Sequence, residues 1–107
     1  GATMTSYYLL KNPKTKIQAA AFIGMSARMS PNGIDTLKTL KSVKMPILDL
    51  YGDNDLPAVL TSAGDRKKAG SNNSNYKQVM IKGANHFFDD KNTELLDSLN
   101  HWLATVK

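Results

Sequence analysis

The stretch that decides the fold runs from residue 47 to residue 55 and reads ILDLYGDND. Its first five residues are mostly apolar, and Gly52 ends the run. A short apolar run that stops at a glycine is typical of a strand buried on both faces of a sheet. Asp49 interrupts the run, so it is either an error in this strand assignment or a buried acid with a partner elsewhere in the chain.

Two further apolar runs flank this stretch along the chain. Residues 17–25 (IQAAAFIGM) precede it, and residues 76–81 (YKQVMI) follow it. The segments between the runs place their apolar residues at helical spacing. Strands that alternate with helices indicate parallel strands joined by right-handed crossovers. The sequence therefore predicts a three-layer α/β fold, a parallel sheet of about three strands flanked by helices.

Four helices are expected around this sheet. Their apolar faces are marked by Met4, Tyr7 and Tyr8; Ile34, Leu37 and Leu40; Leu56, Val59, Leu60 and Ala63; and Leu95, Leu96, Leu99, Trp102, Leu103 and Val106. Asn12-Pro13 stops the first helix. The third begins at Pro57, whose missing N–H costs nothing in a first turn, and stops at Gly70. The last is the most amphipathic.

Composition narrows the classes of function. The 107 residues carry 14 basic and 9 acidic side chains, a net charge of +5. The basic residues are spread over helix faces and loops without zinc-ligand spacing or an RNA-binding aromatic motif, so no nucleic-acid partner is expected. The absence of cysteine excludes disulfides and a cysteine nucleophile. No apolar run approaches the ~20 residues that span a bilayer. We expect no membrane span, cofactor or metal, and either a cytoplasmic or a periplasmic location fits.

Polar residues follow each predicted strand directly. Ser26 and Arg28 come after the first, Asp53 and Asp55 after the second, and His86 after the third. In open parallel sheets, ligands bind beyond the carboxyl ends of the strands. Two acids and a histidine are therefore expected to converge at one edge of the sheet.

At these strand ends the sequence resembles the α/β-hydrolases. Within that superfamily it resembles an uncharacterised bacterial hydrolase-like family. Residues 48–55 resemble that superfamily's hydrophobic strand and Gly-x-x-Asp stretch, and residues 81–88 (IKGANHFF) resemble its final strand and histidine loop. The family triad runs in the order serine, acid, histidine. The resemblance implies that Asp55 is the catalytic acid and His86 the general base, and the closing helix with Trp102 fits the same pattern.

The resemblance covers nearly the whole chain and implies a single partial domain over residues 1–107, the C-terminal half of the fold. Gly1 would then be the last glycine of the elbow Gly-x-Ser-x-Gly, with the nucleophile two residues upstream; a purification-tag remnant would also explain it. The parent protein is expected to hydrolyse an ester, an amide or another small acyl substrate. The chain alone is expected to be inactive, because it lacks the nucleophile and the oxyanion hole.

Other polar residues receive different interpretations. Residues 24–27 superficially resemble an elbow around Ser26, but Arg28 and the nearby Pro31 do not suit the tight strand-to-helix turn that an elbow needs. We expect Ser26 to line the substrate site instead. Asp53 is expected to serve as a turn or cap residue. His101 is expected to be a surface residue of the last helix.

Two alternatives and one assembly question stay open. The chain could be a non-catalytic α/β binding or interaction module, and a basic nucleic-acid binder is a weaker possibility. Residues 19–23 (AAAFI) carry no charge, proline or bulge of the kind that protects an exposed strand edge. The resemblance places this strand beside one that the chain lacks. A homo-oligomer that buries the first strand or the first helix is therefore expected.

Overall fold

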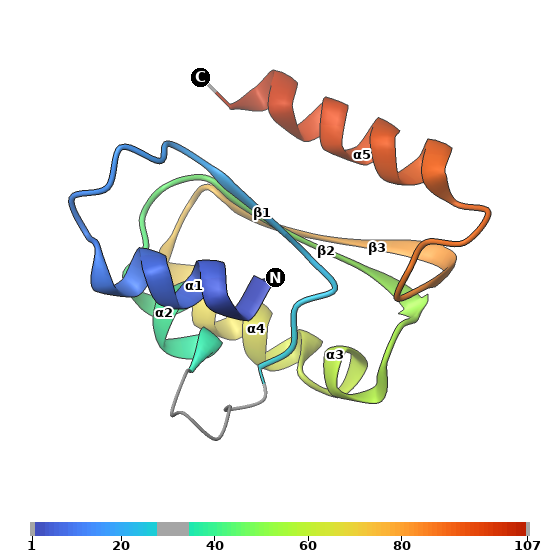
Figure 1. Ribbon diagram of the computed structural model, residues 1–107, viewed down its shortest axis with the longest axis horizontal. Coiled ribbons are helices and arrows are strands. Elements are labelled where there is room, and N and C mark those ends of the chain that lie inside the picture. Colours follow the sequence, from blue (N-terminus) through green and yellow to red (C-terminus); the bar gives the residue numbers. More distant parts are fainter. Residues whose placement is uncertain (1, 28–34, 107) are drawn as a thin grey trace.

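The computed structural model describes residues 2–27 and 35–106 (Figure 1). Its elements are α1 (Ala2–Lys11), β1 (Ala20–Ile23), α2 (Thr36–Ser42), β2 (Ile47–Asn54), α3 (Pro57–Thr61), α4 (Ala63–Ala69), a 3₁₀ turn (Gly70–Asn72), β3 (Tyr76–Asn85) and α5 (Asn92–Thr105). The predicted alternation of helices and strands is confirmed. The predicted loop residues Arg28, Pro31 and Gly33, and the helix residue Ile34, lie outside the described ranges.

The described strands form one parallel sheet in the order β1-β2-β3, which confirms the predicted three-layer α/β architecture. β2 is central: Ile47 lies opposite Ala20 on one side and Tyr76 on the other. Because all three strands run the same way, their carboxyl ends meet at one edge. That edge holds the candidate site.

Strand lengths differ from the prediction. β1 covers only four of the expected residues 17–25, whereas β2 and β3 continue to Asn54 and Asn85. β1 is short because its pairing starts where β2 starts, after Pro46, and ends where Gly24 turns the chain with φ +68°. A positive φ breaks the extended conformation and favours glycine.

Helices cover the two faces of the sheet unequally (Figure 1). α1, α2 and α4 pack on one face, over a core of Leu9, Phe22, Met25, Leu40, Ile47 and Ala69. The other core, on the α5 side, consists of Leu48, Leu50, Ile81, Ala84, Phe88 and Trp102. Residues 47–52 of β2 are all buried, as the apolar run predicts. Alternate side chains of this strand therefore supply both cores.

The helix expected between Pro57 and Gly70 is two helices, so that prediction is wrong. The chain breaks at Ser62, which belongs to neither α3 nor α4. Its hydroxyl donates to the carbonyl of Ala58 at 2.7 Å and accepts from the backbone N–H of Ala27 at 3.1 Å. Serine side chains that bond nearby backbone compete with helix geometry. The break thus ties this segment to the loop after β1.

Asp49 is a buried acid with partners and not an error of assignment. Arg66 Nε lies 2.9 Å from Asp49 Oδ2, and both side chains are fully buried. Tyr76 and Gln78 also donate to Oδ2, at 2.5 and 3.1 Å. Arg66 is therefore an exception among the basic residues, most of which are expected on solvated helix faces or in loops, because a buried carboxylate requires a charged or hydrogen-bonding partner.

Candidate functional site

Asp55 and His86 meet at the end of the sheet where the carboxyl ends of the parallel strands lie. Asp55 follows β2 directly, and His86 follows β3. The distance between Asp55 Oδ1 and His86 Nδ1 is 2.7 Å, so the expected contact is present. Two residues 31 positions apart are thus brought together by parallel pairing and by strands that end at the same level.

The Asp55 carboxylate is fixed by its own turn. Its Oδ1 accepts a hydrogen bond from the backbone N–H of Leu56 at 2.8 Å, and its Oδ2 accepts one from that of Gly52 at 3.3 Å. The side chain is fully buried. These contacts replace lost hydration and hold one oxygen toward the imidazole.

Gly52 is required by the close approach of β2 and β3. A Cβ on Gly52 would lie 2.1 Å from the carbonyl oxygen of Ala84, a backbone atom that cannot move aside. The pairing also shifts register between Gly52 and Asn54, after which Asn54 lies opposite Asn85. The glycine of the Gly-x-x-Asp stretch therefore permits the geometry that brings the two strand ends together.

His86 offers a partly exposed ring nitrogen. Its side chain is 31% exposed, and Asp55 is its one hydrogen-bond partner within residues 2–27 and 35–106. Hydrogen-bond chemistry assigns the proton to Nδ1, because the buried carboxylate is an acceptor. Nε2 then carries the free lone pair. An imidazole held in this tautomer can accept a proton from a substrate or a nucleophile.

Two neighbours confine the imidazole ring. The ring of Phe87 stands edge-on at 5.4 Å between centroids, and its side chain is mostly exposed. On the loop after β1, Gly24 comes so close to the ring that a Cβ on residue 24 would lie 2.8 Å from His86 Cε1. The sequence reasoning missed Gly24, although a glycine directly after a buried strand is the available signal.

The histidine loop is held by short-range hydrogen bonds. Asn85 Oδ1 accepts from the backbone N–H groups of Phe87 and Asp89, at 2.9 and 3.2 Å. Phe88 takes a positive φ of 56° and buries its ring in the α5-side core. This conformation sends Phe88 inward while His86 stays at the surface.

Asp53 does not join the Asp55–His86 pair. Its Oδ1 accepts from the backbone N–H of Gly83 at 2.7 Å, where Gly83 has a φ of +78°. Asp53 lies within β2 and links it to β3, so the expectation of a turn or cap residue is wrong. His101 is exposed on α5, which agrees with its prediction.

Ser26 lies on the loop after β1 and is half-buried. Its carbonyl accepts from the hydroxyl of Thr36 at 2.7 Å, and no hydrogen bond joins its side chain to His86. A nucleophile has to reach the base directly, and this contact is absent. The lining role of Ser26 stays a prediction.

Within residues 2–27 and 35–106, no cluster of three His, Asp or Glu side chains could hold a metal ion. In the same part of the chain, no helix is long and apolar enough to cross a membrane. No family model and no curated protein sequence matches this chain. The functional argument consequently rests on the geometry of the site.

Proposed function

We propose that this chain supplies the acid and the base of an α/β-hydrolase of the serine type, which hydrolyses an ester, an amide or another small acyl substrate. The observation that carries the proposal is the 2.7 Å contact between Asp55 Oδ1 and His86 Nδ1 at the carboxyl edge of the parallel sheet. Its support is the arrangement of a buried acid, an oriented imidazole and a free, accessible Nε2.

In this proposal His86 acts as a general base and then as a general acid. Nε2 takes the proton of a serine hydroxyl as its oxygen attacks the acyl carbon, and it returns that proton to the leaving group. Asp55 keeps the ring in the required tautomer and stabilises the imidazolium that forms. Asp55 is suited to this part because two backbone N–H groups already hold its carboxylate.

The nucleophile in this proposal comes from a residue outside the chain. No hydrogen bond joins the side chains of Ser26 and His86, and Nε2 has no hydrogen-bond partner among the described side chains. The order serine, acid, histidine places the missing serine ahead of Asp55 along the sequence. Residues 1–107 alone are therefore expected to hydrolyse activated esters no faster than their H86A variant.

A serine-directed fluorophosphonate tests the proposal. The probe is applied to residues 1–107 and to the longest product that the gene encodes, and the labelled residue is identified by mass spectrometry. We expect labelling only in the longer product, at a serine upstream of Gly1, with strong loss in H86A and D55N. The matched control is H101A, because His101 is the other histidine and is exposed on α5.

Three outcomes would count against this assignment. Labelling of residues 1–107 at Ser26 would place the nucleophile inside the chain. A longer product that is labelled at no serine would leave Asp55–His86 as a structural pair and would favour the non-catalytic module. Labelling that H101A reduces as strongly as H86A would mean that the loss reflects damage to the fold.

We also propose that the chain forms a homo-oligomer through β1. Among the described strands, only β2 pairs with β1, so the outer edge of β1 is open. Ala21 and Ile23 are exposed, whereas their register partners Leu48 and Leu50 are fully buried. An open, uncharged edge beside an apolar face is a ready surface for pairing with another copy.

A further inference from the structure

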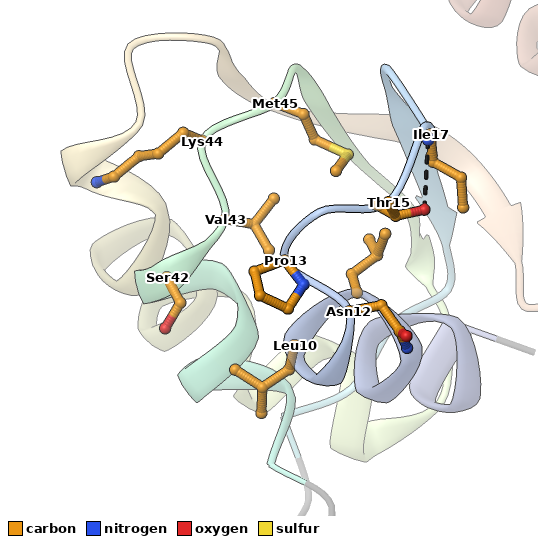
Figure 2. A pocket seen from close by; sticks show the side chains of 10 residues that line it. Leu10, Asn12, Pro13, Thr15, Ile17, Ser42, Val43, Lys44 and Met45 are labelled. Atoms are coloured by element: carbon orange, nitrogen blue, oxygen red, sulfur yellow. Dashed lines mark hydrogen bonds between the residues drawn. The ribbon is translucent and has the colours of Figure 1, made fainter.

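The amino end of the sheet holds a pocket of about 350 Å³, at the opposite end from His86. It lies between the loop that leads from α1 to β1 and the loop that leads from α2 to β2 (Figure 2). Pockets of this volume are typical of small-molecule sites. The lining residues are Leu9, Leu10, Asn12, Pro13, Thr15, Ile17, Ser42, Val43, Lys44 and Met45.

Three polar side chains of the pocket make hydrogen bonds within the protein. Asn12 donates to the carbonyl of Tyr8 at 2.9 Å, and Ser42 donates to that of Lys38 at 2.9 Å. The hydroxyl of Thr15 accepts from the backbone N–H of Ile17 at 3.4 Å. The interior offers polar and apolar surface in nearly equal parts, and the apolar part includes Pro13, Val43 and Met45 around the hollow in Figure 2.

One wall of the pocket is held in place from behind. The buried side chain of Asn73 donates to the carbonyls of Val43 and Met45, at 3.2 and 2.7 Å. These two backbone oxygens would otherwise need water or a ligand. The wall is thus preformed, which lowers the cost of binding.

Positive charge is concentrated around this pocket. The two segments that line the pocket, residues 9–17 and 42–45, contain four basic residues and no acidic one. Lys44 lines the pocket, and Lys14 lines an adjoining hollow that shares Asn12, Pro13 and Thr15 with it. The Lys44 side chain extends outward in Figure 2, and its flexible stem can bring the ammonium to an anion at the mouth.

We propose that this pocket binds a small anionic amphiphile, a single hydrocarbon chain that carries a carboxylate or a similar head group. The hydrocarbon chain lies on the apolar side chains between Leu10 and Met45, and the head group lies among the lysines at the mouth. Apolar side chains in the interior and a cationic rim complement the two halves of such a molecule. The site is separate from Asp55 and His86, so it stands independently of the proposed hydrolase function.

Calorimetric titration with decanoate tests this proposal. We expect saturable 1:1 binding of decanoate, and none of butanoate, which has the charge without the chain. The double variant Lys14→Glu, Lys44→Glu should bind decanoate about five- to tenfold more weakly at low salt, the effect of losing two exposed charge contacts. Its matched control is Lys67→Glu, Lys82→Glu, which reverses two exposed charges elsewhere and should change the affinity less than about twofold.

A second variant tests the cavity itself. Leu10→Trp fills the pocket from α1, while Leu96→Trp adds the same bulk at an exposed position of α5. Only the first should abolish binding, with circular dichroism confirming that both are folded. If Leu10→Trp does not fold, loss of binding on Met45→Trp serves the same purpose.

Absence of saturable decanoate binding, or equal binding by the lysine double variant and its control, would overturn the proposal. Binding only to anionic lipid vesicles, undiminished by the pocket-filling variant, would also overturn it and assign the lysines to a membrane surface.

Discussion

Gly24 lies against the imidazole of His86, where a side chain on residue 24 would occupy the space of the ring. A Cβ there would come within 2.8 Å of Cε1 and 2.9 Å of Nδ1. Gly24 also has a φ of +68°, which other residues adopt at a cost of about 1–2 kcal/mol. The loop after β1 and the loop after β3 thus fit together only if residue 24 is glycine.

We expect Gly24→Ala to displace His86 and break its hydrogen bond to Asp55. The measurement is the Nδ1 proton of His86 in the low-field proton NMR spectrum, which should disappear or shift strongly upfield. Gly64→Ala is the matched control, because a Cβ on Gly64 meets nothing within 4 Å. A helical glycine replaced by alanine should stabilise the protein by about 0.5–1 kcal/mol. An unchanged low-field signal in Gly24→Ala would contradict the positioning role of Gly24.

The ion pair between Asp49 and Arg66 should be costly to break from one side. Arg66→Met leaves a buried carboxylate without its charge partner, which is expected to cost about 3–5 kcal/mol of unfolding free energy. Chemical denaturation measures this loss. The double variant Asp49→Leu, Arg66→Met should recover part of it, because an apolar pair replaces both charges. The recovery is incomplete because Tyr76 and Gln78 lose their acceptor on Asp49.

Lys67→Met provides the comparison for that series. Lys67 is the next residue of α4 and is exposed, so its removal should change the unfolding free energy by less than about 0.5 kcal/mol. A loss in Arg66→Met no larger than in Lys67→Met would show that the buried pair adds nothing to stability.

These relationships also mark how far the sequence could predict the structure. The apolar run at 47–51 and the polar residues at strand ends were sufficient for the parallel sheet and for the meeting of Asp55 with His86, because both depend on periodicity and on parallel pairing. The partner of Asp49 was not predictable, since Arg66 lies 17 positions away and resembles the exposed lysines that follow it. The break at Ser62 was not predictable either, since its hydroxyl bonds the nearby carbonyl of Ala58 and also takes part in a tertiary contact with Ala27, which no local pattern encodes.

Tyr76 should make stability fall at alkaline pH. Burial raises the pKa of Tyr76 far above its ordinary value, and the hydrogen bond to the carboxylate of Asp49 raises it further. In the unfolded chain Tyr76 loses its proton near pH 10, whereas the folded protein retains it. The unfolded state then binds fewer protons, so stability decreases as the pH rises above that value.

The measurement is the urea midpoint at pH 8, 10 and 11 for the wild type and for Tyr76→Phe. The wild type should lose more stability over this range than the variant, which has no proton to retain. Tyr8→Phe is the control, because Tyr8 is about half exposed and should leave the pH dependence unchanged. If the urea midpoints of the wild type and of Tyr76→Phe fall equally with pH, Tyr76 does not contribute to the loss of stability.

The open edge of β1 leads to the last prediction, on assembly. Ala21 and Ile23 expose apolar surface on the face where Leu48 and Leu50 of the neighbouring strand are buried. A lysine on an edge strand discourages pairing with another chain, because its charge would lose hydration in the new interface. We expect light scattering coupled to gel filtration to show a dimer or a higher oligomer for the wild type, and Ala21→Lys to shift it toward monomer.

Met80→Lys is the control, because Met80 is an exposed apolar residue of the opposite edge strand β3. It should leave the oligomer intact. A wild type that remains a folded monomer at every concentration from low to high micromolar would refute pairing through β1.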